Sequence, residues 1–267
     1  MKVVLFCGGM GMRLREYSES IPKPMVEIGY RPIMWHVMKY YAHYGYKDFI
    51  LCLGYRADVV KKYFVNYDEC ISNNFVLSNG CRDIRLLGSD IGDWRITFVD
   101  TGLRSNIGER LKAVQKYVEN EDVFLANYTD GLTDLRFSEY MERFMASNKI
   151  AAFVSVKPTQ SFHVVQFRGG DEVSGIRHLG ESDIWINGGY FIFRKEIFRY
   201  MKEGEELVRE PFQRLIEDRQ IITLKHNGFW VAMDTFKDKQ FLDDMAAADR
   251  APWEVWKTDG VTGEDAC

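Results

Sequence analysis

The sequence predicts an α/β protein whose mixed, mostly parallel sheet is flanked by helices, with a smaller sheet-rich part toward the C-terminus. Three observations lead to this class. Residues 2–7 form a continuous apolar run that ends at consecutive glycines, as expected for a strand buried on both faces of a parallel sheet. Strand and helix patterns then alternate along much of the chain. Between residues 164 and 193 the pattern becomes strand-rich, with turn signals at glycine pairs.

The first half of the chain supplies most of the alternation. Apolar side chains at helical spacing predict a helix over Ile33–His43, with Gly45 just beyond its end. The apolar run at 49–53 predicts the next strand, and a helix follows over Ala57–Val65. Residues 66–93 are polar and contain Asn73-Asn74 and Asn79-Gly80, so we expect an excursion or hairpin on the rim.

The second half resumes the alternation and adds the sheet-rich part. We expect strands over residues 95–100, 123–128, 150–156 and 221–224, and helices over 107–117, 137–146, 195–201, 211–218 and 236–247. No low-complexity linker divides the chain, so residues 1–257 are predicted to form a single domain. Residues 258–267 are polar and are expected to be a flexible tail.

Composition excludes several classes of protein. Lys and Arg total 35 against 39 Asp and Glu, which gives a net charge of −4 and no electrostatic reason to bind nucleic acid or an anionic membrane. No apolar stretch approaches the ~18 residues of a membrane span. The 5 cysteines are scattered and form no CxxC pair. We therefore expect no disulfide framework or zinc site, and a cytoplasmic location.

A glycine loop directly after the first strand is the first candidate for chemistry. Gly8, Gly9 and Gly11 would let the backbone approach a ligand, and successive N–H groups there can bind an anion. Arg13 adds a planar set of donors that suits phosphate oxygens. The alternative is a plain turn into a helix. The spacing matches neither a dinucleotide-binding GxGxxG motif nor a P-loop.

Lys23 lies between Pro22 and Pro24, which stiffen the backbone around it and would aim its ammonium group. The alternative is a solvated loop lysine, and we expect the side chain to be exposed.

Two aspartates follow apolar runs, Asp130 after residues 123–128 and Asp234 after residues 229–233. Carboxylates at strand ends can hold Mg²⁺ if the fold brings them together. The alternatives are a turn at Asp130-Gly131 and a helix N-cap at Asp234. Ser105 and Arg110, which flank Gly108 before a helix, are weaker candidates: they either contact phosphates or cap and solvate that helix.

These segments together resemble the sugar-nucleotide pyrophosphorylase family of nucleotidyltransferases. The resemblance runs from residue 2 to about residue 256, and its most specific parts are residues 8–14, 22–29, 32–36, 99–102, 185–191 and 228–235. It implies a Rossmann-like sheet, a homo-oligomer, and transfer of a nucleotidyl group from CTP to a sugar 1-phosphate, with glucose 1-phosphate as the expected acceptor. The products would be a CDP-sugar for polysaccharide or deoxysugar synthesis and pyrophosphate.

The resemblance also implies roles for individual residues. Arg13 and Lys23 would act in catalysis, and Asp130 and Asp234 would hold Mg²⁺. The implied nucleotide-binding positions are Phe6, Gly8, Gly9, Gly11, Met12, Arg13, Ser105 and Arg110. The implied acceptor-binding positions are Lys23, Trp185, Asn187 and Gly188.

The chain departs from the family pattern at four places. Met12 replaces a threonine, and Thr129 replaces the glycine before the metal-binding aspartate. Residues 161–163 replace an Arg-Phe-Gly segment, and residues 178–180 lie near the place of a Glu-Lys-Pro segment whose lysine meets the sugar phosphate. The last two changes remove cations from the acceptor side. Two alternatives therefore stay open: transfer to another phosphate or a phosphonate, and a nucleotide-binding protein without turnover.

Overall fold

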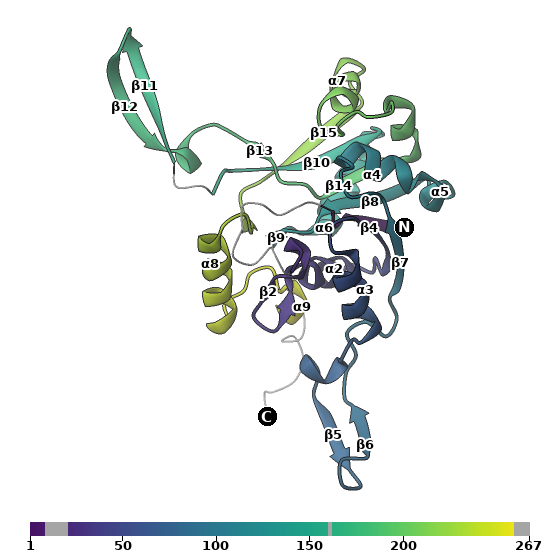
Figure 1. Cartoon of the computed structure of the whole chain (residues 1–267). Coiled ribbons are helices and arrows are strands. Elements are labelled where there is room, and N and C mark those ends of the chain that lie inside the picture. Colours follow the sequence, from purple (N-terminus) through teal and green to yellow (C-terminus); the bar gives the residue numbers. More distant parts are fainter. Residues whose placement is uncertain (9–20, 160–161, 259–267) are drawn as a thin grey trace.

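An eight-stranded sheet forms the centre of the computed structural model, which describes residues 1–8, 21–159 and 162–258 (Figure 1). Across the sheet the strands run β7–β4–β1–β8–β14–β10–β15, and the short β13 pairs with β10 next to β14. Their bounds are β1 Lys2–Phe6, β4 Asp48–Leu53, β7 Arg95–Asp100, β8 Val123–Tyr128, β10 Ala151–Val156, β13 Ile186–Asn187, β14 Phe191–Arg194 and β15 Ile221–His226. The predicted fold class, a mixed and mostly parallel sheet flanked by helices, is confirmed.

Strand direction places one set of strand ends together. β1 is parallel to β4 and β8, and β4 is parallel to β7. β14 is antiparallel to both β8 and β10, so β10 and its parallel partner β15 run in the direction of β8. The carboxyl ends of β1, β4, β7, β8, β10 and β15 therefore share one edge of the sheet, which we call the carboxyl edge. In the sheet-rich part, β13 and β14 extend the same sheet, whereas residues 163–178 pair only with one another.

The two faces of the sheet carry separate hydrophobic cores. In β1, Val3 and Leu5 belong to one core and Val4 and Phe6 to the other, which accounts for the continuous apolar run. The first core is covered by α2 (Ile33–His43), α3 (Ala57–Val65), α6 (Phe137–Ser147) and α8 (Phe236–Ala247). The second is covered by α4 (Ile107–Ala113), α5 (Gln115–Val118), the 3-10 helix η4 (Lys195–Tyr200) and α7 (Glu210–Glu217).

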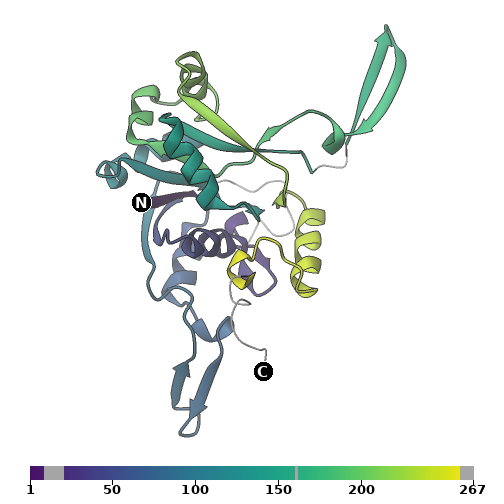
Figure 2. The ribbon, with the colours of Figure 1, turned by 180° about the vertical axis from the view of Figure 1, so that it is seen from behind.

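Two hairpins project from the body in different directions, as both views show (Figures 1 and 2). One, β5 (Phe75–Ser78) with β6 (Asp83–Leu86), lies in the predicted excursion and follows the 3-10 helix η2 (Glu69–Ile71). The other pairs β11 (His163–Gly169) with β12 (Glu172–His178), and the 3-10 helix η3 (Leu179–Glu181) follows it.

Most predicted elements are confirmed, and the differences are local. The helix expected over 107–117 divides into α4 and α5 at Val114, and residues 195–200 form a 3-10 helix. The short elements were not predicted: the 3-10 helix η1 (Lys23–Met25), β2 (Glu27–Ile28), β3 (Arg31–Pro32), β9 (Gly131–Thr133), β16 (Trp230–Ala232) and α9 (Val255–Thr258). None of the helices in the described ranges has the length and apolar character that crossing a bilayer requires.

His36 fastens the C-terminal segment to α2. Its ring is buried, with Nε2 3.0 Å from the carbonyl oxygen of Ile28, while Trp253 Nε1 donates to Nδ1 over 3.3 Å. The neutral ring meets both contacts, since Nε2–H donates and Nδ1 accepts. Burial lowers the pKa of His36 from 6.5 to about 4.

We expect acid to destabilise the fold through His36. Between pH 6.5 and about 4 the unfolded chain binds a proton that the folded chain does not, so stability falls as the pH falls through this window. The loss is complete below about pH 4 and amounts to roughly 3 kcal/mol. Urea unfolding of the wild type and His36→Gln at pH 7 and pH 4 measures this loss of stability, because the variant has no imidazole to protonate. An equal pH dependence in both proteins would contradict the assignment.

Candidate functional site

Two distant parts of the chain place Asp130 and Asp234 side by side at the carboxyl edge. Asp130 lies two residues after Tyr128, the last residue of β8, and β9 starts directly after it. β9 pairs antiparallel with β16, with Ala232 opposite Gly131. The backbone N–H of Met233 then donates to the carbonyl oxygen of Asp130 over 2.8 Å. This short ladder fixes the two aspartates as neighbours although 103 residues lie between them.

Lys23 joins the two carboxylates. Its Nζ lies 2.6 Å from Oδ2 of Asp130 and 2.8 Å from Oδ1 of Asp234. Pro22 is the N-cap of η1 and Pro24 lies in its first turn, so the backbone around the lysine is held as the sequence predicts. The Lys23 side chain is only 17% exposed, so the expectation of an exposed lysine is wrong. The carboxylates are 30% and 34% exposed.

The charge of Lys23 is stabilised by its partners. Burial on its own would lower the pKa of the ammonium group. The charges of Asp130 and Asp234 and the hydrogen bonds to them outweigh burial, so the pKa of Lys23 lies above its usual 10.5. The side chain is therefore a cation at neutral pH.

The predicted alternatives for the two aspartates do not account for their side chains. Thr235 is the N-cap of α8 and forms a capping box with Asp238, so the Asp234 carboxylate does not cap that helix. Asp130 lies in the bend between β8 and β9, where its carboxylate accepts from Lys23 rather than closing a turn.

Gly8, the described end of the glycine loop, packs directly over a buried guanidinium group. A Cβ on Gly8 would lie 2.1 Å from Cζ of Arg110. Arg110 is 1% exposed, and its Nη1 donates to the carbonyl oxygen of Leu53 over 3.1 Å and to Oγ1 of Thr101 over 2.7 Å. Burial lowers the pKa of Arg110. Gly9, Gly11, Met12 and Arg13 lie outside the described residues.

Substituting Gly8 by alanine is expected to destabilise the protein by about 1–3 kcal/mol, because the new methyl group would overpack the Arg110 site. Thermal melting measures the loss. Gly169→Ala is the matched control, since a Cβ there meets nothing within 4 Å. Equal melting temperatures for the two variants would contradict the packing argument.

A cavity of about 220 Å³ opens beside these groups. Its lining comprises Phe6, Cys7, Gly8, Lys23, Pro24, Ile107, Tyr128, Thr129 and Asp130. Burial raises the pKa of Tyr128 to about 12 and the pKa of the Cys7 thiol well above its usual value, so both stay neutral at neutral pH. Sequence reasoning missed Tyr128 as a lining residue. Tyr128 lies two residues before Asp130, and alternate side chains of an extended segment point to the same face. This spacing is the sequence signal that could have identified Tyr128.

Among the other predicted site residues, Asn187 contacts the cavity wall through Tyr128. Ser105 Oγ donates to the carbonyl oxygen of Thr101 over 2.5 Å and so holds the loop before α4. Asn187 Nδ2 lies 3.5 Å from the hydroxyl of Tyr128, which borders the cavity. The carbonyl oxygen of Gly188 accepts from Trp230 Nε1 over 3.0 Å. Trp185 is half-buried, at the start of the short segment that contains β13.

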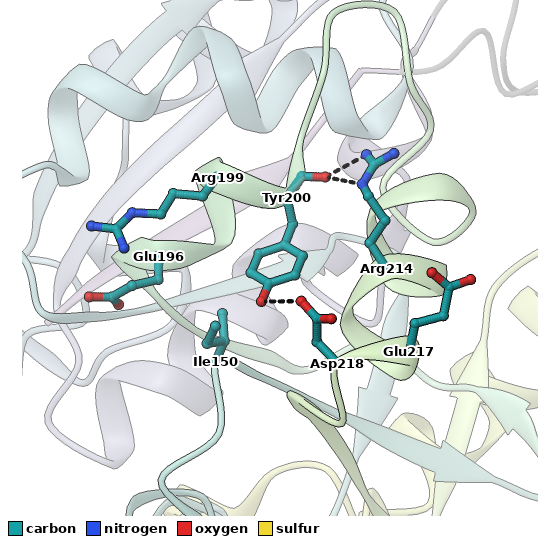
Figure 3. Close-up of a pocket in the computed structure, with 7 residues that line it drawn as sticks. All are labelled: Ile150, Glu196, Arg199, Tyr200, Arg214, Glu217 and Asp218. Carbon is teal, nitrogen blue, oxygen red and sulfur yellow. Dashed lines mark hydrogen bonds between the residues drawn. The ribbon is translucent and has the colours of Figure 1, made fainter.

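A larger open pocket, of about 450 Å³, lies elsewhere (Figure 3). Ile150, which directly precedes β10, lines it, so it borders the opposite edge of the sheet. Three of its polar residues bind one another: the Tyr200 hydroxyl donates to Asp218 over 2.8 Å, and Arg214 donates to the backbone oxygen of Tyr200. We therefore assign the site to the carboxyl edge, where ligands of open α/β sheets bind.

Within residues 1–8, 21–159 and 162–258, no three His, Cys, Asp or Glu side chains gather as metal ligands. The carboxylates of Asp130 and Asp234 on Lys23 are two oxygen donors that a metal ion could use.

Known proteins are similar to the chain along nearly its whole length. A nucleotidyl transferase family model matches residues 2–238. A glucose-1-phosphate cytidylyltransferase of Salmonella typhimurium is 35% identical over 260 residues, which cover 96% of this chain and 100% of that protein. A Bacillus subtilis protein named probable glucose-1-phosphate cytidylyltransferase is 33% identical over 258 residues, with 96% and 100% covered.

Solved structures share the fold at low sequence identity. A UDP-glucose pyrophosphorylase complexed with UDP-glucose superposes with a TM-score of 0.68 and 12% identity, over 93% of this chain and 99% of that one.

Proposed function

Because the chain belongs to the nucleotidyl transferase family, we propose that it is an enzyme that transfers CMP from CTP to glucose 1-phosphate, giving CDP-glucose and pyrophosphate. The activity named for its two cytidylyltransferase relatives supports this choice of nucleotide and acceptor. The observation that carries the proposal is the convergence of Asp130, Asp234 and Lys23 beside a cavity at the carboxyl edge.

The reaction brings two anions together. An oxygen of the acceptor phosphate attacks the α-phosphorus of CTP, the bond from that phosphorus to the oxygen of the β-phosphate breaks, and pyrophosphate leaves. No covalent protein intermediate is required. The protein therefore acts by positioning the reactants and by neutralising their charge.

Lys23 is the residue that we assign to charge neutralisation. Its ammonium group is already held at the cavity wall by two carboxylates. When the triphosphate binds, Lys23 would exchange one or both carboxylate partners for phosphate oxygens. Phe6 and Gly8 would border the nucleotide, and Arg13 would add a second cation from the glycine loop, as the resemblance implies.

The two aspartates fit a magnesium ion. They are hard oxygen donors, and Mg²⁺ is commonly bound by one or two carboxylates together with substrate phosphates. Both carboxylates already bind one cationic group, because the Lys23 ammonium lies within 2.8 Å of each. A metal ion in the place of that ammonium would contact both carboxylates. When bound, the ion would supply positive charge to the phosphates of the nucleotide.

We also propose the setting in which the enzyme works. One sheet runs through both halves, which supports a single nucleotidyltransferase domain over residues 1–257. A homo-oligomer is supported by exposed apolar side chains on the projecting hairpins, among them Leu77 and Phe167. The four cysteines in the described part of the chain are free thiols, which supports a reducing cytoplasm.

Pyrophosphate release tests the activity directly. Each of the four nucleoside triphosphates is paired with glucose 1-phosphate, other phosphorylated acceptors and a phosphonate, with Mg²⁺ present. We expect turnover with CTP and glucose 1-phosphate to exceed every other pair. Turnover of CTP only with another acceptor would overturn the acceptor assignment. Tight CTP binding without turnover on any acceptor would overturn the enzyme assignment.

A further inference from the structure

A tryptophan flanked by two lysines lies at the carboxyl edge, outside the cavity already described. Nζ of Lys157 is 4.5 Å and Nζ of Lys225 is 4.8 Å from the centroid of the Trp185 ring. Lys157 directly follows β10, Lys225 is the last residue but one of β15, and Trp185 directly precedes the antiparallel β13. All three places are at the edge of the sheet that holds Asp130.

Strand register puts this cluster on the same face of the sheet as the cavity. Ser155 of β10 is the register partner of both Asn187 and Lys225, and partners across a sheet point to the same face. Asn187 reaches the hydroxyl of Tyr128, which lines the cavity. The cluster therefore begins one side chain beyond the cavity wall.

The cluster already stabilises a negative charge. Trp185 Nε1 donates to Oδ1 of Asp183 over 3.1 Å, and Lys157 Nζ lies 3.5 Å from the same oxygen. These contacts and the charge of Lys225 lower the pKa of Asp183. The Asp183 side chain is 96% exposed, so its ion pair adds little to stability, and a more highly charged anion could replace it at small cost.

We propose that Lys157, Trp185 and Lys225 form an anion-binding site that holds the phosphate group of the acceptor, glucose 1-phosphate. The inference rests on the proposed function for the identity of the ligand. Two ammonium groups and an indole N–H provide the charge and donors that a sugar phosphate requires. Their position beside the cavity places the acceptor on the side of Asp130 and Lys23.

Lys157 also has a structural contact, and the experiment must distinguish its effect from that of anion binding. Its ammonium donates to the carbonyl oxygen of Ser182 over 2.5 Å and closes the base of the segment that carries β11 and β12. Lys225 is exposed, and it lies over the Trp185 ring and near the charge of Asp183. Lys225→Met removes the charge, keeps the length of the side chain and leaves the Lys157 contact in place.

The test compares wild type, Lys225→Met and Lys116→Met. Lys116 is the matched control because its Nζ lies 5.2 Å from the centroid of the Tyr117 ring, on α5 and away from the site. We expect Lys225→Met to weaken binding of glucose 1-phosphate about tenfold in calorimetry, with CTP affinity and melting temperature unchanged. The salt dependence of glucose 1-phosphate binding should also become shallower, and Lys116→Met should match the wild type.

The outcomes separate the two proposals. Unchanged affinity for glucose 1-phosphate in Lys225→Met overturns the anion site, whatever the turnover. Absence of turnover in a wild type that binds glucose 1-phosphate overturns the proposed function, while the calorimetry still decides on the cluster. Equal losses of glucose 1-phosphate and CTP affinity would show a general effect of net charge and would also overturn the anion site.

Discussion

Asp130→Asn and Asp234→Asn are each expected to lower turnover about 10²–10³-fold while the protein stays folded. Each change removes one negative charge from the pair of carboxylates that would hold Mg²⁺, and it leaves an uncharged side chain of the same shape. The surroundings stay intact, because backbone contacts between β9 and β16 hold both residues in place. Pyrophosphate release at saturating CTP and glucose 1-phosphate measures the effect, with circular dichroism as the measure of folding.

A control on the same strand makes this result specific. Asp122 directly precedes β8 at its amino end, whereas Asp130 follows the carboxyl end. Asp122 is 87% exposed and pairs with Lys195, so Asp122→Asn removes the same charge far from the site. Turnover in this control should match the wild type. Near-normal rates in both site variants at limiting Mg²⁺ would contradict the metal assignment.

The parts of the fold that the sequence predicts are those with long, regular patterns. The apolar run of β1 and the helical spacing in α2 and α3 are local signals, and these elements appear where expected. The break at Val114 is not visible in the sequence because the apolar pattern continues across it. β9 and β16 are three residues each and exist only through pairing between distant parts of the chain.

In the site, too, some features are predicted from local sequence and others depend on contacts between distant parts of the chain. Residue type and strand ends single out Lys23, Asp130 and Asp234, but spacing alone leaves each of them a more ordinary explanation. Only the β9–β16 pairing, a contact over about a hundred residues, brings the aspartates together on Lys23. The Lys157–Trp185–Lys225 cluster is even harder to predict from the sequence, because its residues come from three strands and no local pattern marks Lys225.

Lys23→Ala is expected to lower turnover about 10²–10³-fold, since it removes a cation aimed at the phosphates. Stability should fall by only about 1 kcal/mol, because the two carboxylates left facing one another are about a third exposed and water screens them. Lys47→Ala is the control, a lysine paired with Asp93 on the surface, and it should change neither quantity. Equal relative losses of stability and activity in Lys23→Ala would indicate a structural role.

Metal binding gives the same variant a second and opposite expected result. In the wild type a divalent cation must compete with the Lys23 ammonium for Asp130 and Asp234, because that ammonium lies within 2.8 Å of both carboxylates. Lys23→Ala removes the competitor and leaves two negative charges without a cation between them. Mg²⁺ should therefore raise the melting temperature of Lys23→Ala more than that of the wild type, and at a lower concentration, although the variant is nearly inactive. Equal Mg²⁺ responses in the two proteins would show that the metal does not use these carboxylates, whatever the effect on turnover.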